Sequence, residues 1–268
     1  MTRQTRHTLY TMFRFTVLGI WFLIVAFPTY WIVATAFKPA HEWFAWPPVY
    51  WSSTPTLENY RIVWTGHATG GMTRETATLQ KPWIALGNSL VISLTATTLS
   101  VVFGTLLAYG VSRYGILSEA RMFNLLMFRM IPPIVVAVPL TLYYSTLHLL
   151  DTVIGLVIVY TITTIPYAVW MTKSFVDEVP REMEQAAEIL GASRWRTIWE
   201  VIFPLIRSGV MATFLFILIL TWSEYLMALI LSKTHVVTLP IQLNKFEGTT
   251  EGRIYGRQAA LAVGITFP

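Results

Sequence analysis

The sequence predicts an all-α membrane protein, and three observations support this fold class. Of the 268 residues, 54% are hydrophobic and only 12% are charged, whereas a soluble domain averages about 25% charged residues. The mean hydropathy of the chain is +0.56. Several apolar runs also reach the roughly 20 residues that a helix needs to cross the hydrocarbon core of a bilayer.

The first apolar run covers residues 15–37 and follows a short segment, 1–14, that carries three arginines. A cleaved signal peptide has a shorter apolar core, followed by small residues at the cleavage site. This run is longer and bulkier. We therefore expect a retained span that opens a transmembrane domain, 15–268, with a kink at Pro28.

Four complete apolar runs and one partial run follow, separated by polar segments. The complete runs cover residues 84–111, 122–147, 153–171 and 210–231. The last run begins at Ala259 and ends at Pro268, and about ten residues of helix rise only about 15 Å, half of the roughly 30 Å hydrocarbon core. We expect a sixth span that this chain carries only in part, although a half-span has the same length.

The orientation follows from the basic residues near the ends of the spans. With the N-terminus in the cytoplasm, the internal segments hold ten lysines and arginines and the external segments hold eight. An excess of basic residues inside is the usual arrangement. Segments 38–82 and 232–257 are then external loops, and the polar segment 173–207 is cytoplasmic.

This cytoplasmic segment has the pattern of two short helices. Pro180 can open the first helix, because the first turn has no use for the missing N–H of proline. The helix then covers 181–190 and ends at Gly191, which adopts left-handed backbone without strain. A second short helix, 195–202, leads to Pro204 and the next span.

The first of these helices has a small, apolar face and a polar face. At three- and four-residue spacing, the first face carries Met183, Ala186, Ala187 and Leu190, and the other carries Glu182, Gln185 and Glu188. Small residues let a partner approach the backbone closely, and carboxylates can pair with its basic groups. The pattern predicts a docking surface for a soluble partner, and a solvated amphipathic loop on the membrane surface is the alternative.

These residues resemble the EAA loop of the permeases of binding-protein-dependent ABC importers. In that loop Glu-Ala-Ala is followed by three residues and a glycine, and about a dozen residues later by Leu-Pro. The matching positions here are Gln185, Ala186, Ala187, Gly191, Ala192 and Pro204, and Glu184 stands directly before them.

The resemblance extends over nearly the whole chain and is to the carbohydrate type, the smaller permeases of maltose systems above all. It is carried by Asn88-Ser89-Leu90, Ile131-Pro132-Pro133, Leu150-Asp151-Thr152, Trp222-Ser223-Glu224-Tyr225 and Thr238-Leu239-Pro240-Ile241. Three positions depart from the pattern. Gln185 stands where glutamate is usual, Leu190 where aspartate is common, and Ser208 where proline is common. The glutamine puts one charge contact with an ATPase in doubt, but the alanines and the glycine keep the fit.

The resemblance implies a six-span, all-α ABC importer permease in a prokaryotic inner membrane. A second, non-identical permease would complete the translocation path, and an external sugar-binding protein would deliver the sugar. An ATPase dimer would dock on the loop and bind ATP and magnesium, so this chain itself would bind no cofactor. Importers for a polyol, glycerol phosphate or another solute use the same machinery and remain alternatives.

Prolines inside spans are candidates for the translocation path. A proline leaves a backbone carbonyl without its hydrogen bond, and broken helices often line the path of a transporter. Pro132 and Pro133 together are the best candidates for a functional bend. Simple kinks packed within the protein would have the same sequence.

Glu224, with Ser223 and Tyr225 beside it, is the carboxylate that we place deepest in a span. Charges inside a membrane are costly and usually face a cavity or a partner. Glu224 is thus a candidate for the path or its gate, and a structural hydrogen-bonding role or a place near the membrane interface fits equally. Arg129 could be its partner or could extend towards the membrane surface.

Span 84–111 carries a small residue at every fourth position, from Ala96 through Ser100, Gly104 and Ala108 to Ser112 just beyond it. Such a stripe allows two helices to pack closely in lipid. We expect it to pack within this subunit, with a contact to the second permease as the alternative.

Several kinds of chemistry are absent from the sequence. It holds no cysteine, which excludes disulfides and thiolate metal sites, and its five histidines lack the spacing of metal ligands. It contains neither a phosphate-binding Gly-x-x-x-x-Gly-Lys-Ser/Thr loop nor a Gly-x-Ser-x-Gly elbow. We therefore expect no catalytic residue and no metal site. The alternatives from other classes are a membrane scaffold and an intramembrane enzyme, which would need a convergent set of acids and bases.

Overall fold

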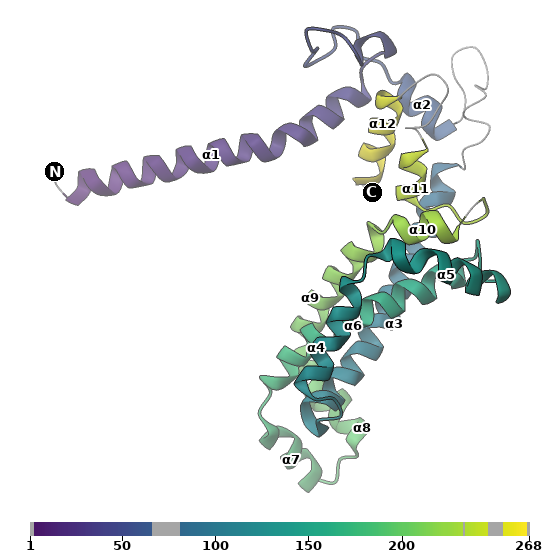
Figure 1. The fold of residues 1–268 in the computed structure, drawn as a ribbon. Helices are drawn as coiled ribbons and strands as arrows, with labels where there is room; N and C mark the ends of the chain where they lie inside the picture. Colours follow the sequence, from purple (N-terminus) through teal and green to yellow (C-terminus); the bar gives the residue numbers. More distant parts are fainter. Residues whose placement is uncertain (1–2, 66–80, 233, 246–253, 267–268) are drawn as a thin grey trace. The chain divides into compact units, whose positions relative to one another are not determined.

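The computed structural model describes residues 3–65, 81–232, 234–245 and 254–266, apart from the side chains of 3–9, 128 and 129. Every regular element among these residues is a helix (Figure 1). Four described helical stretches are long and apolar enough to cross a membrane: Tyr10–Ala36, Pro82–Tyr114, Val153–Asp177 and Arg194–Trp222. These helices agree with the predicted all-α membrane protein. The chain forms two compact units, Met1–Trp83 with Gln242–Pro268, and Ile84–Ile241.

The unit Ile84–Ile241 is built on three long helices, α3 (Pro82–Tyr114), α6 (Val153–Asp177) and α9 (Phe203–Trp222). The shorter elements are α4 (Glu119–Met130), α5 (Pro133–Thr146), α7 (Arg181–Ile189), α8 (Arg194–Thr197), a π-helical turn (Ile198–Ile202) and α10 (Leu226–Leu231). One apolar cluster joins α3, α5, α6 and α10, and a second joins α3, α6 and α9. The last helix, α11 (Leu239–Asn244), leads into the other unit.

The small-residue stripe of α3 packs on α6. Ser100 and Gly104 are both buried, and a Cβ atom at Gly104 would overlap Ala168 of α6. The Thr164 hydroxyl of α6 donates to Ser100 Oγ at 2.9 Å. The prediction that the stripe packs within this subunit is confirmed.

The predicted span 122–147 is wrong as one continuous helix, because this stretch forms two helices. α4 ends before Ile131, whose backbone is extended (φ −62°, ψ 122°), and α5 begins at Pro133 with Pro132 as its N-cap residue. A residue that precedes proline is disfavoured in the helical region, and a proline has no N–H to continue the helix. Two successive prolines therefore separate the helices.

The predicted span 210–231 is also wrong in its bounds. Its helix begins earlier, as α9, and ends at Trp222, and Ser223 to Tyr225 separate it from α10. The helix α10 packs against α5. The helices that follow the two breaks therefore lie side by side.

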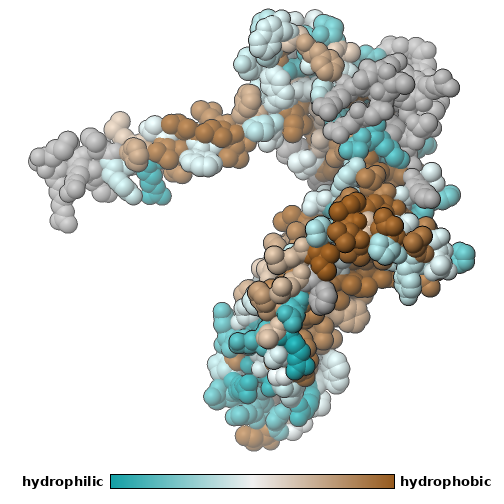
Figure 2. All heavy atoms as spheres, viewed as in Figure 1, coloured by the Kyte–Doolittle hydropathy of each residue, from teal (hydrophilic) through white to brown (hydrophobic). Residues whose placement is uncertain are grey.

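The other unit contains α1 (Arg3–Ala36), a 3₁₀ turn (Ala40–Glu42), α2 (Glu58–Thr65) and α12 (Tyr255–Thr266). α12 packs on α2 and on α1, and Ala34 to Ala36 at the end of α1 are buried. α1 continues through Pro28. Between Tyr10 and Ile32, α1 exposes large apolar side chains (Figure 2), which require lipid or another protein chain as a neighbour. α12 begins before the predicted start at Ala259, and residues 267–268 lie outside the described part.

Candidate functional site

The predicted docking segment, residues 180–204, begins with α7, whose two ends follow from local sequence. Pro180 is the N-cap residue of α7, with extended backbone (φ −59°, ψ 136°). At the other end Gly191 is left-handed, with φ +82°. The N–H of Gly191 donates to Glu188 O at 2.9 Å and that of Ala192 to Ala187 O at 3.0 Å, which is a Schellman motif. The predicted helix end at Gly191 is confirmed.

The second predicted helix, 195–202, does not stop at Pro204. Ser193 caps α8 by accepting the N–H of Arg196 at 3.4 Å, and helical backbone then runs continuously from Arg194 to Trp222. Pro204 lies in the first turn of α9, and the π-helical turn directly precedes it. The proline ring crowds the carbonyl of Glu200, and a π turn is a common way to accommodate such an interruption. The helix α8 is therefore continuous with the membrane-spanning helix α9.

Glu184 of α7 points inward and is bound by the last turns of α3. Its carboxylate pairs with the Nε of Arg113 and accepts the hydroxyl of Tyr109 at 2.7 Å. The Nη2 of Arg113 also donates to Val179 O, just before α7, at 2.8 Å. The side chains of Arg113 and Glu184 are only 7% and 14% exposed. This buried ion pair, which the sequence analysis did not identify, fixes α7 to α3.

Further polar contacts join the segment to the same end of α3. Ser112 O accepts from Arg181 Nη2 at 3.3 Å, and Ser112 Oγ donates to the carboxylate of Asp177 at the end of α6, just before the segment. Arg194 of α8 lies over the ring of Tyr114, 5.1 Å from its centre, and donates to its hydroxyl. The C-terminal turns of α3 thus hold both helices of the segment. No sequence pattern pairs these residues, which lie between 65 and 80 positions apart.

The outer face of the segment is apolar at its tip. Ile189 and Leu190 are 86% and 87% exposed, although most of this end of the unit is hydrophilic (Figure 2). Gln185 and Ala186 are exposed on the same helix, whereas Ala187 is buried. The two alanines therefore serve different purposes, since Ala186 faces outward and Ala187 packs inside. An exposed apolar tip on a polar segment is typical of an interaction site.

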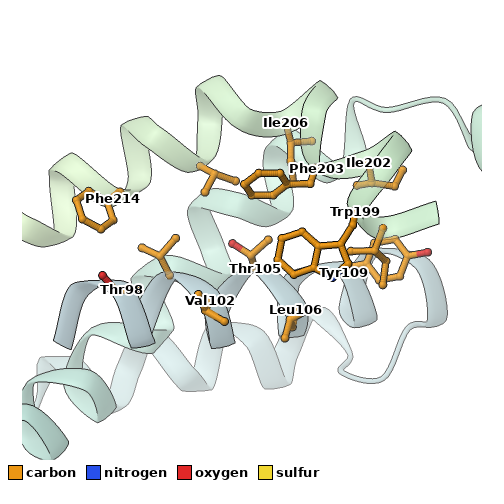
Figure 3. A pocket seen from close by; sticks show the side chains of 13 residues that line it. Thr98, Val102, Thr105, Leu106, Tyr109, Trp199, Ile202, Phe203, Ile206 and Phe214 are labelled. Atoms are coloured by element: carbon orange, nitrogen blue, oxygen red, sulfur yellow. The ribbon is translucent and has the colours of Figure 1, made fainter. Parts of the chain in front are cut away.

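An apolar cavity of about 190 Å³ lies between α3 and the start of α9 (Figure 3). The rings of Trp199 and Phe203, 5.3 Å apart, line it together with Leu106 and Tyr109 of α3. Polar contacts therefore fix the segment to the C-terminal end of α3. Next to them, along α3, the cavity is bounded by the apolar surfaces of α3 and α9.

The two predicted path motifs form the helix breaks. Glu224 caps α10, because its carboxylate accepts the N–H groups of Met227 at 3.0 Å and Ala228 at 3.2 Å. Ser223 Oγ donates to Ile219 O at 2.7 Å. Of the two roles considered for Glu224, the structural hydrogen-bonding role is thus observed. The side chain of Arg129, its suggested partner, lies outside the described part.

Asp151 organises the loop between α10 and α11. Its backbone is left-handed (φ +58°), and its carboxylate accepts the N–H groups of Thr234, His235 and Val236 at 2.9–3.0 Å. Its own N–H donates to Leu231 O at 2.8 Å. One carboxylate thus joins the α5–α6 turn to a loop more than 80 positions away.

We expect Asp151→Ala to lower the stability of the chain by about 2–4 kcal/mol, since four hydrogen bonds to a charged acceptor are lost, three from backbone N–H groups and one from the Thr234 hydroxyl at 3.3 Å. Asp151→Asn should cost less, because asparagine tolerates left-handed backbone and keeps one acceptor oxygen. Thermal unfolding in detergent, followed by helical circular dichroism, measures both. An equal loss for the two variants would contradict this role of the carboxylate.

The comparisons with known proteins agree with this architecture. A family model described as "Binding-protein-dependent transport system inner membrane component" matches residues 100–267. A probable ABC transporter permease of Sinorhizobium fredii, y4oR, is 31% identical over 267 residues, covering all of this chain and 90% of the relative. The trehalose transport system permease SugB of Mycobacterium tuberculosis is 29% identical over 244 residues, covering 90% of this chain and 84% of the relative.

The fold also matches that of a solved protein. The crystal structure of a bacterial ABC transporter involved in the import of the acidic polysaccharide alginate contains a chain with a TM-score of 0.75 and 18% identity to this one. The match covers 100% of this chain and 94% of that chain, so this chain has the ABC permease fold. The family match covers more than half of the sequence, and the chain belongs to the binding-protein-dependent transport system inner membrane components: it is a non-catalytic permease subunit of an ABC importer.

Proposed function

We propose that this chain is one half of the translocation path of an ATP-driven sugar importer, with six spans in the assembled protein and its N-terminus in the cytoplasm. The partners are an ATPase dimer that binds ATP and magnesium, a second, non-identical permease and an external sugar-binding protein. The observation that carries the proposal is the segment 180–204, which exposes an apolar tip and is anchored to a membrane-spanning helix by a buried ion pair.

The ATPase docks on Gln185, Ala186 and the exposed tip at Ile189 and Leu190. Gly191 and Ala192 shape the turn behind the tip, and Pro204 marks where the segment joins α9. Glu184 contributes from within, because it holds α7 against α3. Gln185, where the family pattern has glutamate, offers hydrogen bonds in place of a charge contact.

Coupling is mechanical in this proposal. Binding of ATP closes the ATPase dimer and displaces α7 and α8 with it. The ion pair carries the displacement to α3, and the continuous helix carries it to α9. ATP can shift the equilibrium between the inward- and outward-open states only by its differential affinity for the two states.

The two helix breaks, at Pro132-Pro133 and at Ser223-Glu224-Tyr225, line the path. Support comes from the packing of α10 on α5, which brings the helices after the two breaks together. Ser223 is exposed, and Glu224 and Tyr225 are partly exposed. Interrupted spans with accessible polar groups are common at transport sites.

The sugar cargo is supported by the trehalose permease among the relatives, and a polyol or glycerol phosphate is the alternative. A pull-down of the tagged, full-length chain in mild detergent, with mass spectrometry of the bound proteins, tests the assembly. We expect an ATPase, a second permease and a binding protein whose ligand identifies the cargo. Recovery of this chain alone, under conditions that keep a reference importer intact, would overturn the proposal.

A further inference from the structure

A second cavity, of about 420 Å³, lies in the unit that contains α1, α2 and α12. It opens between the C-terminal end of α1, the turn that follows it and the first turns of α12. Its size is within the range of small-molecule pockets, about 300–1,000 Å³. The lining combines three aromatic rings with three polar side chains, namely Trp31, Trp43, Tyr255, Thr35, Lys38 and Gln258.

Lys38 is the most informative residue of this pocket. The residue is only 2% exposed, and its ammonium group lies 3.9 Å from the centre of the Trp31 ring. Among the described residues the ammonium has no hydrogen-bond acceptor, although it carries three donors. Burial lowers the pKa of Lys38, and the nearby carboxylate of Glu42 opposes this shift. A buried cation without acceptors is costly, so the site favours a ligand that supplies oxygen atoms.

The backbone around Lys38 is fixed. Its carbonyl accepts the indole N–H of Trp43 at 3.0 Å and the side-chain amide of Asn59 at 2.9 Å. Trp43 packs flat against Gly256 of α12, where a Cβ atom would overlap its ring. The pocket is therefore preorganised, which lowers the entropy that a ligand loses on binding.

One more polar group that lines the pocket lacks a partner among the described residues. The hydroxyl of Thr35 is buried and makes no hydrogen bond there. Such groups are rare in native proteins because burial without a hydrogen bond is costly. A ligand rich in hydroxyl groups can donate to this oxygen and accept from Lys38.

The chemistry of the lining selects among ligands. A wholly apolar ligand would leave the ammonium unpaired, and a small inorganic anion would leave the aromatic walls uncovered. A sugar ring meets both demands, because its C–H face packs on the electron-rich face of an aromatic ring and its hydroxyl groups are donors and acceptors.

We propose that this pocket binds one sugar ring at the outer surface of the membrane, with the ring against the aromatic walls and its oxygen atoms on Lys38. This proposal rests on the proposed function for the orientation and for sugar as the cargo. The site would receive sugar before it enters the path between the permeases. It uses no residue of the segment 180–204 and none of the helix breaks.

Saturation-transfer NMR on the full-length chain in lipid nanodiscs tests the site, with D-glucose, maltose and trehalose as probes. We expect saturation of the ring protons of at least one sugar, and at least tenfold weaker binding for Lys38→Met. Thr35→Val, which keeps the shape of threonine, should weaken binding about threefold or more. The matched control is Lys81→Met, because Lys81 also lies near a tryptophan ring, that of Trp83, but outside the pocket.

The outcomes separate this proposal from the proposed function. Absence of saturation for all three sugars, or equal binding by wild type, Lys38→Met and Thr35→Val, overturns the sugar site even if the ATPase is recovered in the pull-down. The sugar site is also overturned if phospholipid co-purifies with the wild type and Lys38→Met releases it, because the occupant is then a lipid headgroup. If sugar binding depends on Lys38 but the pull-down recovers no ATPase, the sugar site is supported. Only the proposed importer assembly is then contradicted.

Discussion

Replacing Arg113 with alanine is expected to abolish uptake by the assembled importer while the chain remains in the membrane. The arginine is almost fully buried, pairs with Glu184 and also donates to Val179 O. Its removal leaves the carboxylate of Glu184 buried with only the hydroxyl of Tyr109 as a partner. Breaking one side of a buried pair costs about 3–5 kcal/mol, enough to detach α7 from α3.

The measurement is uptake and ATP hydrolysis by the purified importer in proteoliposomes. We expect loss of uptake for Arg113→Ala and a partial loss for Arg113→Lys, because lysine keeps the charge but cannot reach both partners with the fork of arginine. Arg196→Ala is the control. Arg196 pairs with Glu200 on the surface, with both side chains more than 60% exposed, and such an exposed pair contributes little to stability.

A double-mutant cycle with Glu184→Gln separates coupling from general damage. If the pair is the mechanical link, Glu184→Gln should lower ATPase binding by the wild-type permease but should lower it little further in Arg113→Ala, since the two residues act together. If Arg113→Ala takes up sugar at the wild-type rate, in a complex that retains its ATPase, then α7 does not need this anchor.

The parts of the fold that depend on local chemistry could be predicted from the sequence. The start of α7 after Pro180 and its end at Gly191 follow from the backbone preferences of two residues. The apolar runs likewise located the long helices. The sequence predicts a bend at Pro132-Pro133 but not a helix end, because apolar composition continues across the two prolines and conceals the end of α4.

The anchor of the docking segment could not be predicted, since it depends on tertiary contacts. Arg113 and Glu184 are 71 positions apart, and in the sequence Arg113 is only one more basic residue at the end of a span. Glu224 was recognised as unusual. Its role became clear only from the end of α9 at Trp222, which leaves the first N–H groups of α10 for its carboxylate.

Substitution of Gly191 is expected to have the second large effect on coupling to the ATPase. The left-handed backbone of this residue (φ +82°) holds the turn between α7 and α8. A Cβ atom at Gly191 would meet nothing within 4 Å. Any effect of a substitution therefore comes from the backbone conformation and from contact with a partner. Left-handed backbone costs an ordinary residue about 1–2 kcal/mol, most for a β-branched side chain.

Three substitutions distinguish these contributions. Gly191→Asn should keep most of the coupling, because asparagine tolerates left-handed backbone. Gly191→Ala should lower ATPase affinity about fivefold to tenfold, which corresponds to the roughly 1–1.4 kcal/mol that alanine loses in left-handed backbone. Gly191→Val should abolish sugar-stimulated ATP hydrolysis, since valine resists the Schellman turn and the tip at Ile189 and Leu190 is displaced.

Binding of the purified ATPase to the permease in nanodiscs, measured beside sugar-stimulated ATP hydrolysis, ranks the three variants. The order asparagine, alanine, valine is specific to a backbone requirement, because asparagine and valine are both larger than alanine. If asparagine and valine reduce binding equally, the space beside the glycine matters and its conformation does not. If all three bind the ATPase as the wild type does, the turn at Gly191 does not position the docking surface, and the ATPase docks elsewhere on this permease.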